Sequence, residues 1–233
     1  MTAQTIAEAF ADAAARLTGG VDVAGDLVAL LADCTALMQM DSAGLLVDVP
    51  GEGLALLSST SHKMTVLELY ELQNGLGPCI QAIEDNAVVS AAEAELEESW
   101  EPVGRAVVDA GYSAVHAFPL RWHERAVGAL NLFATDVREL DEDRRGLGQA
   151  FANMAIAILA QSRPASWAEV HQLILGVLDD RIVIEQAKGV LAVQYDTDLS
   201  EAYTLLVTNA GQQGIPLSEL AAQVLVSTRR PSP

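Results

Sequence analysis

Apolar residues along the first 162 positions follow two spacings that alternate along the chain. Apolar positions recur three and four residues apart in six stretches, which predicts helices over residues 6–17, 26–40, 62–73, 78–83, 100–110 and 141–161. Short apolar runs bounded by Gly, Pro and polar residues predict strands over residues 44–49, 53–58, 87–90, 113–120 and 126–133. We therefore predict an α+β domain over residues 1–162, an antiparallel sheet flanked by helices.

The pattern changes after residue 162. Pro164 cannot continue the preceding helix, and Ser166 with Glu169 forms a capping box that starts a new one. Asp198 with Glu201 caps a second helix from residue 200 to about 208, residues 211–216 form a loop, and a third helix covers residues 217–226. We predict a linker at residues 163–169 and an all-α three-helix bundle over residues 170–230.

The first helix of this bundle carries an apolar row with a period of seven residues. Its members are Val170, Val177, Ile184 and Leu191. Such a row fits the seam of a second helix, and we predict a homodimer through it. The alternative is that the row packs only against the other two helices of the bundle.

Composition limits the partners and the compartment. The two cysteines, Cys34 and Cys79, are far apart, no apolar run is long enough to span a membrane, and the N-terminus lacks a secretion signal, so we expect a cytoplasmic protein that does not enter a membrane. The net charge is −19, and residues 167–233 hold 8 acidic against 4 basic residues. An acidic surface repels nucleic acid unless basic groups gather locally.

Few residues carry obvious chemistry. Without a phosphate-binding loop, a nucleophile elbow or a metalloprotease motif, we expect no enzyme, no catalytic residue, no metal site and no identified cofactor. The acidic run at residues 93–101 is interpreted as a solvated loop. Cys79 and His116 could face a ligand, but a buried cysteine and a hydrogen-bonded core histidine are the simpler interpretations.

Two sets of phrases carry a family resemblance. The segment RIVIEQAKGVLA at residues 181–192, with Glu201-Ala202-Tyr203 after it, resembles the ANTAR domain. The first domain resembles GAF domains in the phrases at residues 43–46, 67–73, 77–79, 110–112, 114–117 and 128–133. Together they resemble the GAF and ANTAR domain-containing transcription antitermination regulators of actinobacteria.

The resemblance implies a sensor joined to an RNA binder. ANTAR domains form dimeric three-helix bundles that hold paired RNA hairpins, which implies RNA-binding roles for Arg181, Gln186, Lys188, Gly189 and Tyr203. GAF domains sense small molecules or partner proteins, which implies a ligand pocket at Cys79, His116 and Phe118. For Lys188 and Arg181 the alternative is a solvated side chain, with Arg181 paired to Glu185.

One segment departs from the family. Related domains carry several arginines between the positions of Tyr203 and Leu217, but residues 205–216 contain no basic residue here. Phosphate neutralisation supplies much of RNA affinity. Two functions therefore stay open: an RNA-binding antitermination regulator, or a sensor and dimerisation protein whose ANTAR-like bundle contacts proteins and has lost RNA binding.

Overall fold

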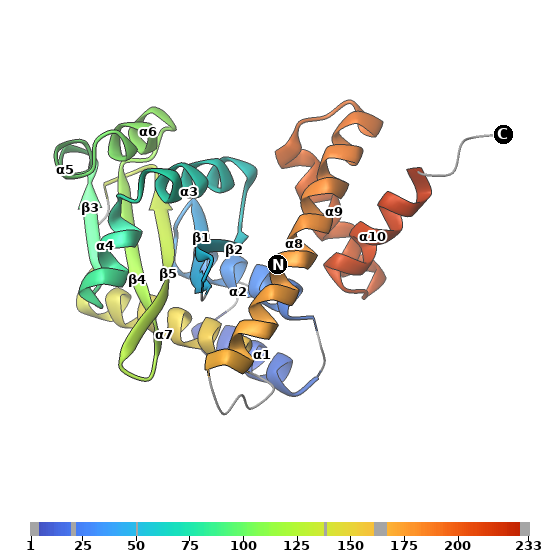
Figure 1. Ribbon diagram of the computed structural model, residues 1–233, viewed down its shortest axis with the longest axis horizontal. Coiled ribbons are helices and arrows are strands. Elements are labelled where there is room, and N and C mark those ends of the chain that lie inside the picture. Colours follow the sequence, from blue (N-terminus) through green and yellow to red (C-terminus); the bar gives the residue numbers. More distant parts are fainter. Residues whose placement is uncertain (1–4, 20–21, 50, 138, 161–166, 229–233) are drawn as a thin grey trace.

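A five-stranded antiparallel sheet organises the N-terminal domain in the computed structural model, which describes residues 5–19, 22–49, 51–137, 139–160 and 167–228. The strand order is β2-β1-β5-β4-β3, and all neighbours run antiparallel (Figure 1). The predicted antiparallel α+β domain is therefore confirmed. The strands are β1 (Ser42–Val49), β2 (Gly53–Ser59), β3 (Val89–Ala92), β4 (Ala114–Trp122) and β5 (Arg125–Ala134).

Helices cover both faces of this sheet because alternate strand residues point to opposite sides. Leu45, Phe118 and Leu130 pack with residues of the first group of helices in the largest core. Leu46 and Ala117, one position along their strands, pack on the other face with the second group. The first group is α1 (Ile6–Gly19), α2 (Val23–Met38) and α7 (Glu142–Leu159), and the second is α3 (His62–Asn74), α4 (Pro78–Asp85), α5 (Glu93–Ser99) and α6 (Val103–Asp109).

Helix α5 corrects the sequence-based interpretation of the acidic run. That run forms a short helix over Glu93–Ser99 instead of a solvated loop, and it is held by the buried side chain of Leu96. The helix predicted from residue 100 begins only at Val103, after Pro102. Two helices of seven residues each, separated by Pro102, leave too little periodicity in the sequence to reveal either boundary.

Three helices form the C-terminal bundle, as predicted. The side chain of Asp198 accepts a hydrogen bond from the backbone N–H of Glu201 at 2.8 Å and caps the second helix. That helix runs through Gly211, predicted as loop, and ends where Gly214 adopts a left-handed conformation. The predicted capping box at residues 166–169 lies outside the described side chains. The helices are α8 (Trp167–Tyr195), α9 (Leu199–Gln213) and α10 (Leu217–Thr228).

Helix α8 belongs to two cores at once. Ile174 and Val177 are buried in the large core of the N-terminal domain, whereas Ile184 and Leu191 are buried among α9 and α10. The row with a period of seven is therefore covered within one chain; the side chain of Val170 lies outside the described residues. The reason given for a homodimer was wrong, and dimerisation itself stays a prediction. In the part of the chain that the structure describes, no helix combines the length and apolarity that crossing a membrane requires.

Lysine substitutions in this row should destabilise the fold of each chain and not act only on its association with a second chain. Val177→Lys with Ile184→Lys would bury two charges, so we expect the free energy of unfolding to fall by about 3 kcal/mol or more. Equilibrium denaturation with urea measures this. Val193→Lys on the same helix, where Val193 is 85% exposed, should change stability by less than about 0.5 kcal/mol. A folded double variant that shifts only from dimer to monomer would contradict the assignment.

Candidate nucleic-acid interface

The five residues predicted to bind RNA lie on two faces of the bundle. Each residue of an α-helix turns by about 100°, so Arg181 and Lys188, seven residues apart, share one face of α8. Gln186 precedes Lys188 by two residues, or about 200°, so it lies on the opposite face of α8. Gly189 follows Lys188 by one residue, or about 100°, and lies closer to Gln186 than to Lys188 around the helix. The structure brings Arg181, Lys188 and Tyr203 together against the N-terminal domain, and it places Gln186 and Gly189 on the opposite, open side.

Lys188 is almost completely buried. It is 2% exposed, and its Nζ donates to both carboxylate oxygens of Glu185 at 2.9 and 2.8 Å. The same Nζ lies 5.1 Å from the centre of the Tyr203 ring. The positive charge of Lys188 is thus balanced inside the protein and does not face solvent.

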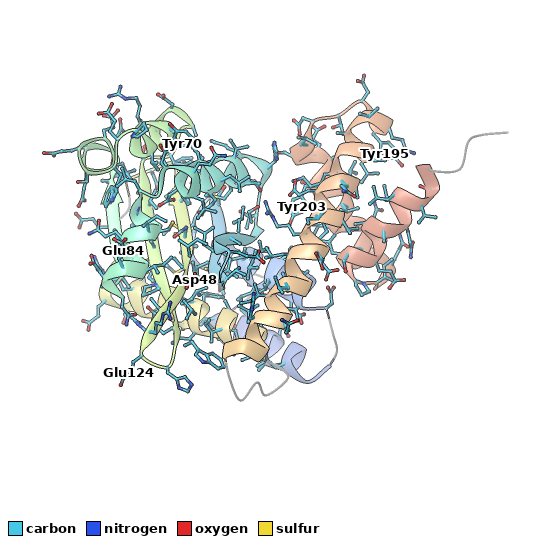
Figure 2. All side chains as sticks on the ribbon, viewed as in Figure 1. Asp48, Tyr70, Glu84, Glu124, Tyr195 and Tyr203 are labelled. Atoms are coloured by element: carbon cyan, nitrogen blue, oxygen red, sulfur yellow. The ribbon has the colours of Figure 1, made fainter. Side chains whose placement is uncertain are left out.

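Tyr203 joins the bundle to the sheet. Its hydroxyl donates to the carbonyl oxygen of Ser59, at the end of edge strand β2, at 3.2 Å. Burial, and then the nearby Glu185 carboxylate, raise the pKa of Tyr203 to about 12. Figure 2 shows Tyr203 in the space between the two domains and Tyr195 on the side of the bundle away from it.

The contact between the domains is closed. It leaves a small pocket of about 30 Å³, lined by Val28 and Ser59 from the N-terminal domain and by Arg181, Lys188 and Tyr203 from the bundle. That volume holds about one water molecule. Burial lowers the pKa of Arg181, which the Glu185 carboxylate partly offsets. The Lys188 amine is therefore shielded from solvent while the domains are docked, whereas Arg181 is only partly buried.

The open face of the bundle carries no positive charge among its described residues. A shallow groove of about 920 Å³ runs between α8 and α10. Its lining is uncharged and consists of Gln186, Gly189, Val190, Val193, Gln194, Leu225 and Ser227. Arg181 and Lys188 are the only lysine or arginine between residues 167 and 228, so the basic face of the bundle is the one that the N-terminal domain covers.

The residues predicted to line a ligand pocket do not meet. Phe118 is buried in the large core beside α7, where its ring leaves no room for a Cβ on Gly148. His116 borders a cleft of about 280 Å³ beside β3. Cys79 is buried on the other face of the sheet, with Leu46, Ala117 and Ala129. Cys79 lies on α4, which packs against Ala117, whereas His116 and Phe118 point to the other face of β4. The sequence did not reveal which residues of β4 face α4.

A buried polar cluster surrounds Cys79, and sequence analysis missed its other members. Glu68, Glu71 and Asn131 are 0%, 3% and 0% exposed. The Asn131 amide donates to both oxygens of Glu68 at 2.8 and 3.0 Å, and Glu71 accepts from the backbone N–H of Cys79 at 2.9 Å. Glu68 and Glu71 lie three residues apart on the buried face of α3. This spacing is the feature of the sequence that could have revealed them as buried acids. Asn131 occupies an inward position of β5 where alternation calls for an apolar residue.

Burial changes the protonation of this cluster. Desolvation raises the pKa of Glu68 well above its usual range, and the neighbouring Glu71 raises it further. Desolvation also raises the pKa of Glu71 to about 7, against the opposing effect of hydrogen bonds from Cys79 and Ile80. The pKa of the Cys79 thiol is raised by burial and by both carboxylates. All three shifts favour the protonated forms of these groups.

Comparison with known proteins assigns the two parts of the chain. The ANTAR domain family matches residues 176–225, which include Arg181 and Lys188. The N-terminal part superposes on solved GAF domains. The chain joins a GAF fold to an ANTAR domain. A search among curated proteins finds no match.

The GAF likeness is one of fold. The GAF domain of a phosphoenolpyruvate-protein phosphotransferase from Acinetobacter is 12% identical, with a TM-score of 0.52 over 69% of this chain and 95% of that one. The phycoerythrobilin-bound GAF domain of a cyanobacterial phytochrome is 14% identical, with a TM-score of 0.51 over 68% and 96%. Free methionine-R-sulfoxide reductase from Neisseria meningitidis, in complex with its substrate, is 15% identical, with a TM-score of 0.50 over 69% and 92%.

Removing the Tyr203 hydroxyl should loosen the docking of the ANTAR domain. Tyr203→Phe loses the bond to Ser59, and we expect a loss of about 0.5–1.5 kcal/mol in equilibrium unfolding together with faster labelling of the Lys188 amine. Tyr195→Phe is the matched control, because Tyr195 is 61% exposed. Equal stability and equal Lys188 labelling in the two variants would show that this bond does not hold the domains together.

Proposed function

We propose that this protein is a non-catalytic, cytoplasmic RNA-binding regulator of transcription antitermination, controlled by its GAF domain. The observation that carries the proposal is the ANTAR match over residues 176–225, which contains Arg181 and Lys188 on one helical face. Two basic side chains per chain, doubled in a homodimer, would contact the phosphates of paired RNA hairpins with a marked dependence on salt.

Control by the GAF domain follows from the burial of that face. With Lys188 at 2% exposure and paired to Glu185, the docked form cannot offer its charge to a phosphate. RNA binding then requires the GAF and ANTAR domains to separate, and it competes with their docking. A small molecule or partner protein that binds better to the separated form would shift this equilibrium toward RNA binding.

A second candidate function rests on the uncharged surfaces. Residues 204–216 contain no basic side chain, and the groove between α8 and α10 is lined by uncharged residues. These features favour a bundle that contacts a protein instead of RNA. The two candidates differ in what happens when Lys188 is exposed, and the two experiments that follow separate them.

Removal of the two basic side chains should weaken RNA binding. For Arg181→Ala with Lys188→Ala we expect an affinity for a paired-hairpin RNA at least about tenfold lower and a flatter salt dependence. The control is Arg105→Ala with Arg125→Ala, which removes two exposed charges from the GAF domain. Filter binding over a salt series measures both. Unchanged affinity in the first variant, or equal losses in both, would contradict the proposed contact.

Opening the domain contact should strengthen RNA binding. Val28 on α2 packs against the core of the ANTAR domain, so Val28→Gln should weaken docking and raise RNA affinity by about tenfold. Ala94→Gln, on the exposed surface of α5 far from the ANTAR domain in Figure 1, should leave RNA affinity unchanged. If neither wild type nor Val28→Gln binds RNA, the second candidate function is favoured.

A further inference from the structure

The cluster around Cys79 contains three groups of the kind that bind metal ions. The carboxylates of Glu68 and Glu71 and the thiol of Cys79 are buried, and their ligand atoms all lie within 4.8 Å of one another. They come from two segments, α3 and the first turn of α4. A tetrahedral zinc ion with bonds of about 2.0–2.3 Å sets its ligand atoms about 3.4–3.8 Å apart, so a contraction of about 1 Å would complete the geometry.

The amide of Asn131 adds a fourth group and an unsatisfied atom. Asn131 is fully buried, it contacts Glu68 and Cys79, and its Oδ1 has no hydrogen-bond partner. Buried polar atoms nearly always find a partner in folded proteins. An amide oxygen is also a metal ligand, and the oxygen and nitrogen of an amide exchange places by a simple rotation of the group.

The backbone around the cluster makes room for the two carboxylates. A Cβ on Gly44 of β1 would collide with the Glu68 carboxylate, and a Cβ on Gly77 would collide with the Glu71 carboxylate. Two glycines from separate segments thus leave the space into which two acids are buried. None of the ion pairs found among the described residues gives either acid a cationic partner. Burying acids without a cation is costly, and such groups are concentrated at functional sites.

We propose that Glu68, Glu71, Cys79 and Asn131 form a binding site for one divalent transition-metal ion of the zinc class in the GAF domain. A thiolate among oxygen ligands favours Zn²⁺, Co²⁺ or Fe²⁺ over Mg²⁺ and Ca²⁺. Metal ligands bind in their deprotonated forms, so any protons on the two carboxyl groups and the thiol pass to solvent as the ion binds. The ion would also tie α3 to the start of α4. Because the site lies apart from Arg181 and Lys188, this inference does not depend on RNA binding, and it goes against the expectation from sequence of no metal site.

Titration of the full-length protein with Co²⁺ after chelator treatment tests the site. We expect one tightly bound Co²⁺ per chain, with a thiolate-to-cobalt charge-transfer band that Zn²⁺ abolishes by displacement. Cys79→Ser should lose the band, whereas Cys34→Ala, which removes the other buried cysteine, should keep it. Glu68→Gln, of nearly the same shape, should weaken Co²⁺ binding by about 100-fold or more.

Thermal denaturation with and without Zn²⁺ keeps the test decisive if Cys79→Ser does not fold. Zn²⁺ should raise the melting temperature of wild type and not that of Glu68→Gln, because an ion that binds only the folded state stabilises it. The proposal is overturned if wild type binds neither ion at micromolar concentration. It is equally overturned if bound Co²⁺ shows no thiolate band, or if the band survives in Cys79→Ser. Surface acids that bind metal weakly would not respond to the Cys79 and Glu68 changes.

Discussion

Helix α8 places its apolar side chains in two hydrophobic cores, and its continuous backbone fixes the angle between them. Ile174 and Val177 are held by the GAF core, and Ile184 and Leu191 by the ANTAR core. Because each residue turns the helix by about 100°, the spacing between these two pairs determines which side of the ANTAR domain faces the sheet. The position of Lys188 at the interface follows from that phase, as does the open position of Gln186. Adding or removing one residue between Val177 and Ile184 would rotate a different face of the ANTAR domain toward the sheet.

The interface combines apolar packing between the domains with a basic side chain that is paired within its own helix. Lys188 is neutralised by Glu185 within the same helix, so the pair needs no partner from the GAF domain to remain satisfied. Across the interface, the described contacts include the burial of Ile174 and Val177 in the GAF core, apolar packing around Val28 and a hydrogen bond from Tyr203 to Ser59. Separation of the domains would therefore leave the charge of Lys188 paired with Glu185. This arrangement suits a contact that forms and breaks, in a protein whose net charge of −19 otherwise repels nucleic acid.

The sequence predicted the positions of the helices and strands more accurately than it predicted what packs against each of their faces. Hydrophobic spacing located the sheet, the long helices and the Asp198 cap because these depend on neighbours along the chain. The apolar row through Val177 and Ile184 was visible, but its spacing is the same whether a second chain or the same chain covers it. Cys79 was noticed from its motif, whereas Glu68 and Asn131 were not, since their proximity depends on the register of β1, β5 and α3. Likewise, Cys79 and Phe118 were grouped although α4, which carries Cys79, covers the face of the sheet opposite to Phe118.

Strand β2 lies at one edge of the sheet, hydrogen-bonded to β1 on one side only. Near the end of β2, the hydroxyl of Tyr203 donates a hydrogen bond to the carbonyl oxygen of Ser59, and helix α8 packs over the strand. Backbone groups at a bare edge are a template for another strand, from a second molecule or from an extended peptide. Movement of the ANTAR domain would thus uncover two different surfaces together, one basic and one ready to pair with a strand. Exposure of the basic surface would therefore also expose the strand edge, which then either forms a new assembly contact or promotes aggregation.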